Sequence, residues 1–77
     1  MSKIEILRKL REELEQLRQK IMNLEIFLQT NKFLNISLSN KIQTELLREQ
    51  LKTMEKYQNI LISRIALIQD DIDKGEE

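Results

Sequence analysis

Four polar side chains in the C-terminal half of the sequence have the chemistry to hold a small anionic ligand that carries an aromatic ring. They are Tyr57, Arg64, Lys56 and Gln50. Tyr57 offers a flat ring for stacking a nucleobase, and Arg64 offers a guanidinium that binds phosphate or carboxylate through paired hydrogen bonds. These two residues are seven positions apart, which places them on one face of a helix. The structural alternative is that Tyr57 packs in a core with its hydroxyl at the rim, while the Arg64 stem covers apolar surface. From the sequence alone we favour this structural interpretation.

A second candidate site is the basic cluster Arg8, Lys9 and Arg11. Its functional interpretation is an anion or phosphate site. Its structural interpretation is a solvated helix face, because glutamates three and four residues away can form ion pairs with these side chains. We favour the structural interpretation.

Catalytic chemistry has little support in this composition. The sequence has no His, Cys or Pro and a single Gly, so it cannot build a cysteine nucleophile, a histidine base or a glycine-rich phosphate loop. The acidic pairs Glu12-Glu13 and Asp70-Asp71 are adjacent in sequence, so on a helix their side chains point about 100° apart. We therefore expect no catalytic residues, no metal and no cofactor.

Charge and hydropathy also restrict the partners. Thirteen basic residues balance thirteen acidic ones, so the chain has no overall field to attract nucleic acid or an acidic membrane. No apolar run approaches the ~18 residues of a membrane span, and the N-terminal residues do not have the layout of a signal peptide. The absence of cysteine suits a reducing compartment. We expect a cytoplasmic protein with no membrane partner.

Two ladders of apolar residues, spaced alternately three and four apart, predict amphipathic helices that pack on other helices. The residues that we predict to form the core of the assembly are Leu7, Leu10, Leu14, Leu17, Ile21, Leu24, Leu28, Leu47, Leu51, Met54, Leu61, Ile65 and Ile68. Ile72 extends the second ladder. Gln58 is its polar member, and a buried polar residue at such a position often fixes the register or the oligomeric state.

The sequence predicts one all-α domain over residues 1–77, an antiparallel two-helix coiled-coil hairpin. Ser2 and Glu5 form a capping box, so the first helix should span about residues 3–30. A turn over about 31–39 precedes a second helix over about 40–73, with Ser39 as the preferred N-cap and Ser37 or Asn40 as alternatives. Gly75 is a candidate helix stop, and the acidic tail 74–77 should fray. Within the turn, four apolar residues should cover the end of the hairpin: Phe33, Leu34, Ile36 and Leu38.

A turn centred near residue 35 sets the predicted register of the hairpin. It places Leu17 opposite Met54 and Leu14 opposite Tyr57. The same register pairs Leu10 with Ile60 and Leu61, Leu24 with Leu46 and Leu47, and Leu28 with Ile42.

Both helices carry more large apolar residues than one seam can bury. The surplus residues are Ile4, Ile6, Met22, Ile26, Phe27, Leu46, Tyr57, Ile60, Ile62 and Leu67. Each exposed large side chain forgoes about 1.5–3 kcal/mol of burial, so we predict a homo-oligomeric helical bundle, with a four-helix homodimer favoured over a higher oligomer. A parallel contact between first helices stays open, because Glu13 would then meet Arg18, and Lys20 would meet Glu25.

The stretch from Leu38 onward resembles a family of small phage-encoded helical-hairpin proteins named after a gene product of a crAss-like gut phage. The resemblance covers most of the chain, and the residues that carry it are Leu38-Ser39, Leu46-Leu47, Gln50-Leu51, Met54, Tyr57, Ile60-Leu61 and Arg64-Ile65. The chain differs at Asn40-Lys41, where that family usually has acidic residues. The resemblance implies a phage or prophage accessory protein without catalytic residues, which acts in the bacterial cytoplasm.

Three functions fit this pattern, and we favour the first. It is an anti-defence protein that binds a host defence protein through an exposed helix face. The second is a sponge that sequesters a cyclic nucleotide immune signal between subunits, with Tyr57 and Arg64 in the pocket. The third is a structural or assembly protein.

Overall fold

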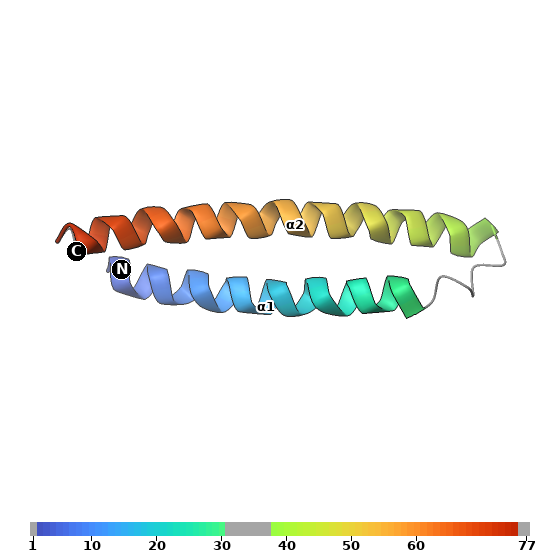
Figure 1. Cartoon of the computed structure of the whole chain (residues 1–77), viewed down its shortest axis with the longest axis horizontal. Helices are drawn as coiled ribbons and strands as arrows, with labels where there is room; N and C mark the ends of the chain where they lie inside the picture. Colours follow the sequence, from blue (N-terminus) through green and yellow to red (C-terminus); the bar gives the residue numbers. More distant parts are fainter. Residues whose placement is uncertain (1, 31–37, 76–77) are drawn as a thin grey trace.

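The chain folds into two long helices that lie side by side and run in opposite directions (Figure 1). The computed structural model describes residues 2–30 and 38–75, and it describes side chains for 2–30 and 41–75. Helix α1 spans Lys3–Thr30 and helix α2 spans Leu38–Asp73, and the described residues include no strand. The molecule is a rod with extents of 57 × 17 × 15 Å.

The helix ends show which terminal signals in the sequence are used. The Glu5 amide donates to the Ser2 hydroxyl at 3.2 Å, and the Ile6 amide donates to the Ser2 carbonyl at 3.0 Å, so Ser2 caps α1 as predicted. At the other end, Gly75 has a φ of 84° and its amide donates to the Ile72 carbonyl at 2.9 Å. Glycine reaches this left-handed conformation without the steric cost of a Cβ atom, so Gly75 ends α2.

The start of α2 differs from the prediction. The helix begins at Leu38, about two residues earlier than expected, so Ser39 lies inside the helix instead of capping it. The alternative cap Ser37 and the apolar residues Phe33, Leu34 and Ile36 lie outside the described residues, as does the side chain of Leu38.

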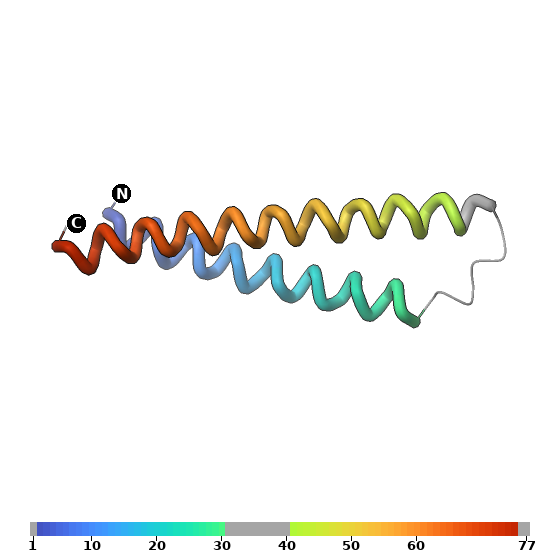
Figure 2. The backbone as a smooth tube through the Cα atoms, turned by 45° about the horizontal axis from the view of Figure 1, so that its top comes forward, coloured from blue at the N-terminus to red at the C-terminus, as the bar shows by residue number. Residues whose placement is uncertain are grey.

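The buried core lies in the half of the rod that is far from the turn. The buried side chains are Leu7, Leu10, Leu14, Leu17, Ile21 and Leu61. The remaining predicted core residues are only half-buried: Leu24, Leu28, Leu47, Leu51, Met54, Ile65 and Ile68. The two helices approach closely near the termini and diverge toward the turn, which explains why the seam is less buried there (Figure 2).

The register of the hairpin differs from the one predicted. Three contacts join the helices, Lys3 with Asp71, Arg11 with Gln69 and Glu13 with Tyr57, and their midpoints fall near residues 37, 40 and 35. The average centre is about two residues beyond position 35, so facing residues shift by about one helical turn. The Glu13–Tyr57 contact itself keeps the predicted midpoint, and the other two contacts lie beyond it. Leu10, whose predicted partner is Leu61, shares one buried cluster with Leu61, and Leu14 belongs to the same cluster.

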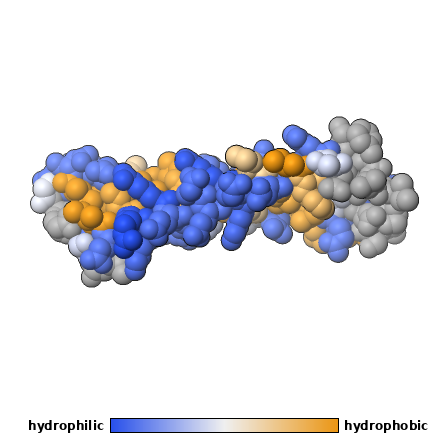
Figure 3. All heavy atoms as spheres, turned by 90° about the horizontal axis from the view of Figure 1, so that it is seen from below, coloured by the Kyte–Doolittle hydropathy of each residue, from blue (hydrophilic) through white to orange (hydrophobic). Residues whose placement is uncertain are grey.

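The predicted apolar surplus is largely exposed in the single chain. Ile6 packs against the core, but the other nine members are exposed, with fractions that range from 38% for Tyr57 to 68% for Leu67. Ile42 is also exposed, at 52%. On the face seen in Figure 3, apolar surface gathers toward both ends of the rod and a hydrophilic stretch lies between. Neither helix has, within its described residues, an apolar stretch that could cross a membrane.

Candidate functional site

Tyr57 lies at the edge of the seam between the helices. It is 38% exposed, and its hydroxyl donates a hydrogen bond to the Glu13 carboxylate on α1. This hydrogen bond, together with partial desolvation and the nearby negative charge, raises the pKa of Tyr57 above its ordinary value. The hydroxyl end of the ring is therefore held by α1, and part of the side chain remains accessible to solvent.

Arg64 stands close enough to Tyr57 for their charges to interact. Its positive charge lowers the pKa of Tyr57, against the larger effect of Glu13. A helical side chain leans toward the N-terminus of its helix, so Arg64 on α2 leans toward Tyr57, one heptad earlier. Gln50 lies one heptad on the other side of Tyr57, and both Gln50 and Arg64 are exposed. The structure thus places three of the four predicted site residues on one line along α2.

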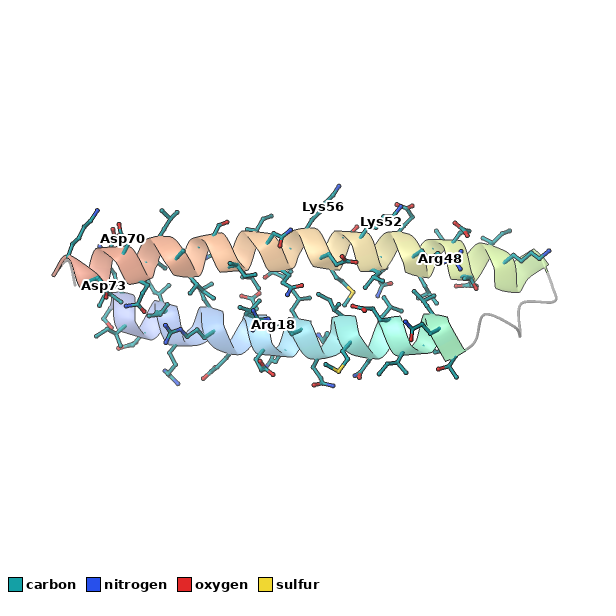
Figure 4. All side chains as sticks on the ribbon, viewed as in Figure 1. Arg18, Arg48, Lys52, Lys56, Asp70 and Asp73 are labelled. Atoms are coloured by element: carbon teal, nitrogen blue, oxygen red, sulfur yellow. The ribbon has the colours of Figure 1, made fainter. Side chains whose placement is uncertain are left out.

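Lys56 occupies a different position. In Figure 4 it extends from the side of α2 that faces away from α1. It directly precedes Tyr57, so the two side chains leave the helix about 100° apart. Lys56 therefore flanks the line of Gln50, Tyr57 and Arg64 instead of belonging to it.

A separate row of exposed residues runs along α2 and contains Gln50, Tyr57 and Arg64. We call this row the lateral stripe. Its seven members are again spaced alternately four and three apart: Leu46, Gln50, Thr53, Tyr57, Ile60, Arg64 and Leu67. All seven are exposed, and its apolar members are among the most exposed large side chains described, with 58% for Leu46, 55% for Ile60 and 68% for Leu67. The Thr53 hydroxyl donates to the Glu49 carbonyl at 3.1 Å, so its polar group is satisfied within the helix.

The surface hollows of the single chain are open to solvent. One of about 330 Å³ lies where the helices diverge and is lined by Arg18, Ile21, Met22, Glu25 and Gln58. Gln58 is half-buried, and no buried side-chain polar atom of the described residues lacks a hydrogen-bond partner. Gln58, the polar residue of the apolar ladder on α2, is therefore only partly enclosed in one chain.

The basic cluster near the N-terminus is largely engaged with its neighbours. Arg8 forms an ion pair with Glu12 one turn later, at 3.5 Å, and Arg11 donates to Gln69 on α2 at 2.9 Å. These contacts match a solvated helix face that also joins the two helices.

The acidic pairs do not converge on a common site. Glu13 accepts the Tyr57 hydroxyl, Asp70 pairs with Lys74 at 3.0 Å, and Asp71 pairs with Lys3 at 3.3 Å. Within the described residues, no group of carboxylates is arranged to hold a metal ion.

Comparison with protein families adds one observation. Residues 5–67 match the family described as Sequestin. The chain belongs to the Sequestin family. The match covers both helices and all seven residues of the lateral stripe. No curated protein and no solved structure matches the chain significantly.

Glu13 is the site residue that the sequence analysis did not connect with Tyr57. In the sequence Glu13 has two other roles, as a member of the acidic pair Glu12-Glu13 and as a partner for Arg18 in a contact between chains. The signal that could have found it is positional, because Glu13 and Tyr57 directly precede the seam residues Leu14 and Gln58. Residues at these positions face each other in an antiparallel helix pair, once the register is known.

Proposed function

We propose that this Sequestin is a non-catalytic protein that binds a nucleotide second messenger on the lateral stripe and keeps it from its receptor. The family name suggests sequestration, and the arrangement of Tyr57 and Arg64 is the observation that carries the ligand class. A ring for stacking and a guanidinium for phosphate lie one heptad apart on the same exposed face of α2, close enough for the charge of Arg64 to act on Tyr57. With the phage origin that the family resemblance implies, the ligand would be a signal of bacterial immunity and the compartment the host cytoplasm.

Three features of the site support binding over catalysis. The Tyr57 hydroxyl is held as a donor by Glu13, with its pKa raised, so it is not a nucleophile at neutral pH. The Glu13 carboxylate can also accept hydrogen bonds from the hydroxyl or amino groups of a nucleotide. The described residues include no group of three or more carboxylates that could hold a catalytic metal ion.

A thermal-shift series tests the proposal. The purified chain is heated with cyclic and linear nucleotides in turn, and one of them should raise the melting temperature. At a hundredfold excess over Kd, binding adds about 2.7 kcal/mol, which corresponds to a rise of about 10–20 °C for a domain of this size. Arg64→Ala and Tyr57→Ala should abolish the rise.

Arg48→Ala is the matched control, because Arg48 is an exposed arginine of the same helix that pairs with Glu45 at 2.8 Å outside the stripe. It should keep the shift. A shift that survives Arg64→Ala, or that disappears equally in Arg48→Ala, contradicts the proposed site.

The second candidate function is capture of a host defence protein. The exposed apolar residues Met22, Ile26 and Ile42, which lie outside the lateral stripe near the turn, favour it, because they present a surface that a partner could cover. This function predicts a stable complex with one host protein that Ile26→Lys disrupts and Arg64→Ala leaves intact. Loss of function in Arg64→Ala, with function kept in Ile26→Lys, favours nucleotide sequestration.

A further inference from the structure

The lateral stripe has the pattern of a helix seam, but α1 contacts it only at Tyr57 among the interactions described. Its seven residues repeat the spacing of the ladder that α2 turns toward α1, yet all seven are exposed. Leu46, Ile60 and Leu67 are its apolar members, and Thr53 occupies the same kind of position with its hydroxyl bonded inside the helix. The polar residues Gln50, Tyr57 and Arg64 alternate with these four. A helix face of this kind is stable in water only when another helix covers it, or at the cost of the burial that Leu46, Ile60 and Leu67 forgo.

We propose that a second copy of the chain covers this stripe, with the two α2 helices antiparallel, and that each ligand site takes Tyr57 and Arg64 from one copy and Gln50 from the other. This inference rests on the proposed function for its ligand, a nucleotide. The interface itself rests on the exposure, spacing and charges of the stripe.

The hairpin supplies the rule that sets the register. Glu13 and Tyr57 each directly precede a seam residue, and they contact each other across the antiparallel pair. On the lateral stripe, the corresponding residues are Glu49, which precedes Gln50, and Lys56, which precedes Tyr57. In an antiparallel pair of α2 helices, Glu49 of each copy therefore faces Lys56 of the other.

Charge complementarity selects this arrangement. The antiparallel pair forms the Glu49–Lys56 contact twice, once on each side of the twofold axis. A parallel pair would instead place Arg64 of one copy beside Arg64 of the other, which is repulsive. Both Glu49 and Lys56 are exposed, so they are accessible to a second copy, although Glu49 is also 3.6 Å from Lys52 in its own chain.

This register determines which residues meet at the ligand. The Glu49–Lys56 contact places the twofold axis between positions 52 and 53, close to Thr53, so Gln50 of the second copy lies level with about residue 55, just before Tyr57. Arg64 leans back toward Tyr57 from the other side along its own helix. The amide of Gln50 and the guanidinium of Arg64 then flank the ring of Tyr57, and symmetry gives two such sites in each dimer. In this arrangement Lys56 contacts Glu49 of the second copy and does not belong to the ligand site.

The interface is tested with single cysteines, which the chain otherwise lacks. Thr53→Cys lies near the axis, so a short bis-maleimide should link two copies efficiently. Leu67→Cys is on the same stripe but should not be linked, because antiparallel copies hold these positions roughly 40 Å apart. Efficient linking at both positions indicates a parallel pair, and no linking at Thr53→Cys overturns the interface.

A matched pair of substitutions tests the apolar part of the stripe. Ile60 and Ile26 are almost equally exposed, at 55% and 54%, but only Ile60 is on the lateral stripe. Ile60→Lys should therefore convert the dimer to a monomer in light scattering, whereas Ile26→Lys should leave the chain dimeric. Lys56→Glu should weaken the dimer several-fold, and the exchange Glu49→Lys with Lys56→Glu should restore it. Dissociation by Ile26→Lys alone overturns the proposal.

Subunit mixing tests the shared site. Gln50→Ala and Arg64→Ala should each abolish nucleotide binding when alone. Refolded together in equal amounts, they form mixed dimers with one complete site, so about a quarter of the wild-type sites should return. No recovery overturns the shared site. If the wild-type chain binds no nucleotide while the cross-linking pattern holds, the proposed function fails and the interface stands. If the monomeric Ile60→Lys chain binds nucleotide fully, the interface fails as part of the site and the function stands.

Discussion

Leu61 should dominate the stability of the hairpin. It is the one described side chain that is completely inaccessible to solvent, and it packs with Leu10, Leu14 and Leu17. Leu61→Ala removes buried methyl groups and leaves a cavity, and such changes cost about 2–5 kcal/mol. A central value of about 3 kcal/mol lowers the melting temperature of a domain of this size by about 12–24 °C.

The assay is thermal unfolding followed by circular dichroism, at a fixed protein concentration for all variants. Ile26→Ala is the matched control, because Ile26 is 54% exposed on α1 and alanine is the better helix former. The control should change the free energy of unfolding by less than about 1 kcal/mol. Equal effects of the two substitutions would refute the reasoning, since they would mean that the core does not lie around Leu61.

Two further predictions concern the site and the first helix cap. Tyr57 is the single tyrosine and there is no tryptophan, so the ionisation of Tyr57 can be followed by ultraviolet absorbance. Glu13→Gln should lower the pKa of Tyr57 toward its ordinary value, and Arg64→Ala should raise this pKa further. Shifts in the opposite directions would contradict the described contacts. Folding raises the pKa of Tyr57, so the Tyr57–Glu13 hydrogen bond stabilises the fold fully below the pKa of unfolded tyrosine. This stabilisation is lost as the pH rises through the pKa of folded Tyr57. Urea unfolding of the wild-type chain and of Glu13→Gln at alkaline pH measures the loss. Ser2→Ala should destabilise the chain by about 0.5–2 kcal/mol in chemical unfolding, whereas the mid-helix control Ser63→Ala should be neutral or slightly stabilising, and equal losses would exclude the cap.

The helices could be predicted from the sequence because their signals are local. Ser2 provides a side-chain acceptor for a free amide, and Gly75 can adopt the left-handed conformation that ends a helix. The start of α2 could not be located as well, because several serines and asparagines near residues 37–40 are all suitable caps.

The register of the hairpin could not be predicted from the apolar ladders. A shift of one helical turn places leucine against leucine again, so the burial energy of the seam barely distinguishes the two registers. Polar contacts such as Lys3 with Asp71 and Arg11 with Gln69 mark the register observed. The divergence of the helices toward the turn is also absent from the pattern, since Leu24 and Leu28 occupy the same ladder as Leu14.

The candidate site could be predicted in part. The spacing of Tyr57 and Arg64 placed them on one face, and the structure places them close enough for their charges to interact. The role of Glu13 depends on the register, and so could not be derived from spacing. The lateral stripe was visible only as a surplus of apolar residues until their exposure in the folded chain was known.

We propose that this Sequestin holds a nucleotide without changing it, and equilibrium dialysis followed by heat release of the bound molecule measures this. The wild-type chain should retain one nucleotide per subunit and return the same, chemically intact molecule when it is unfolded, while Arg64→Ala should retain none. If the wild-type chain retains no nucleotide, or if a cleaved product is recovered, the proposed function is wrong.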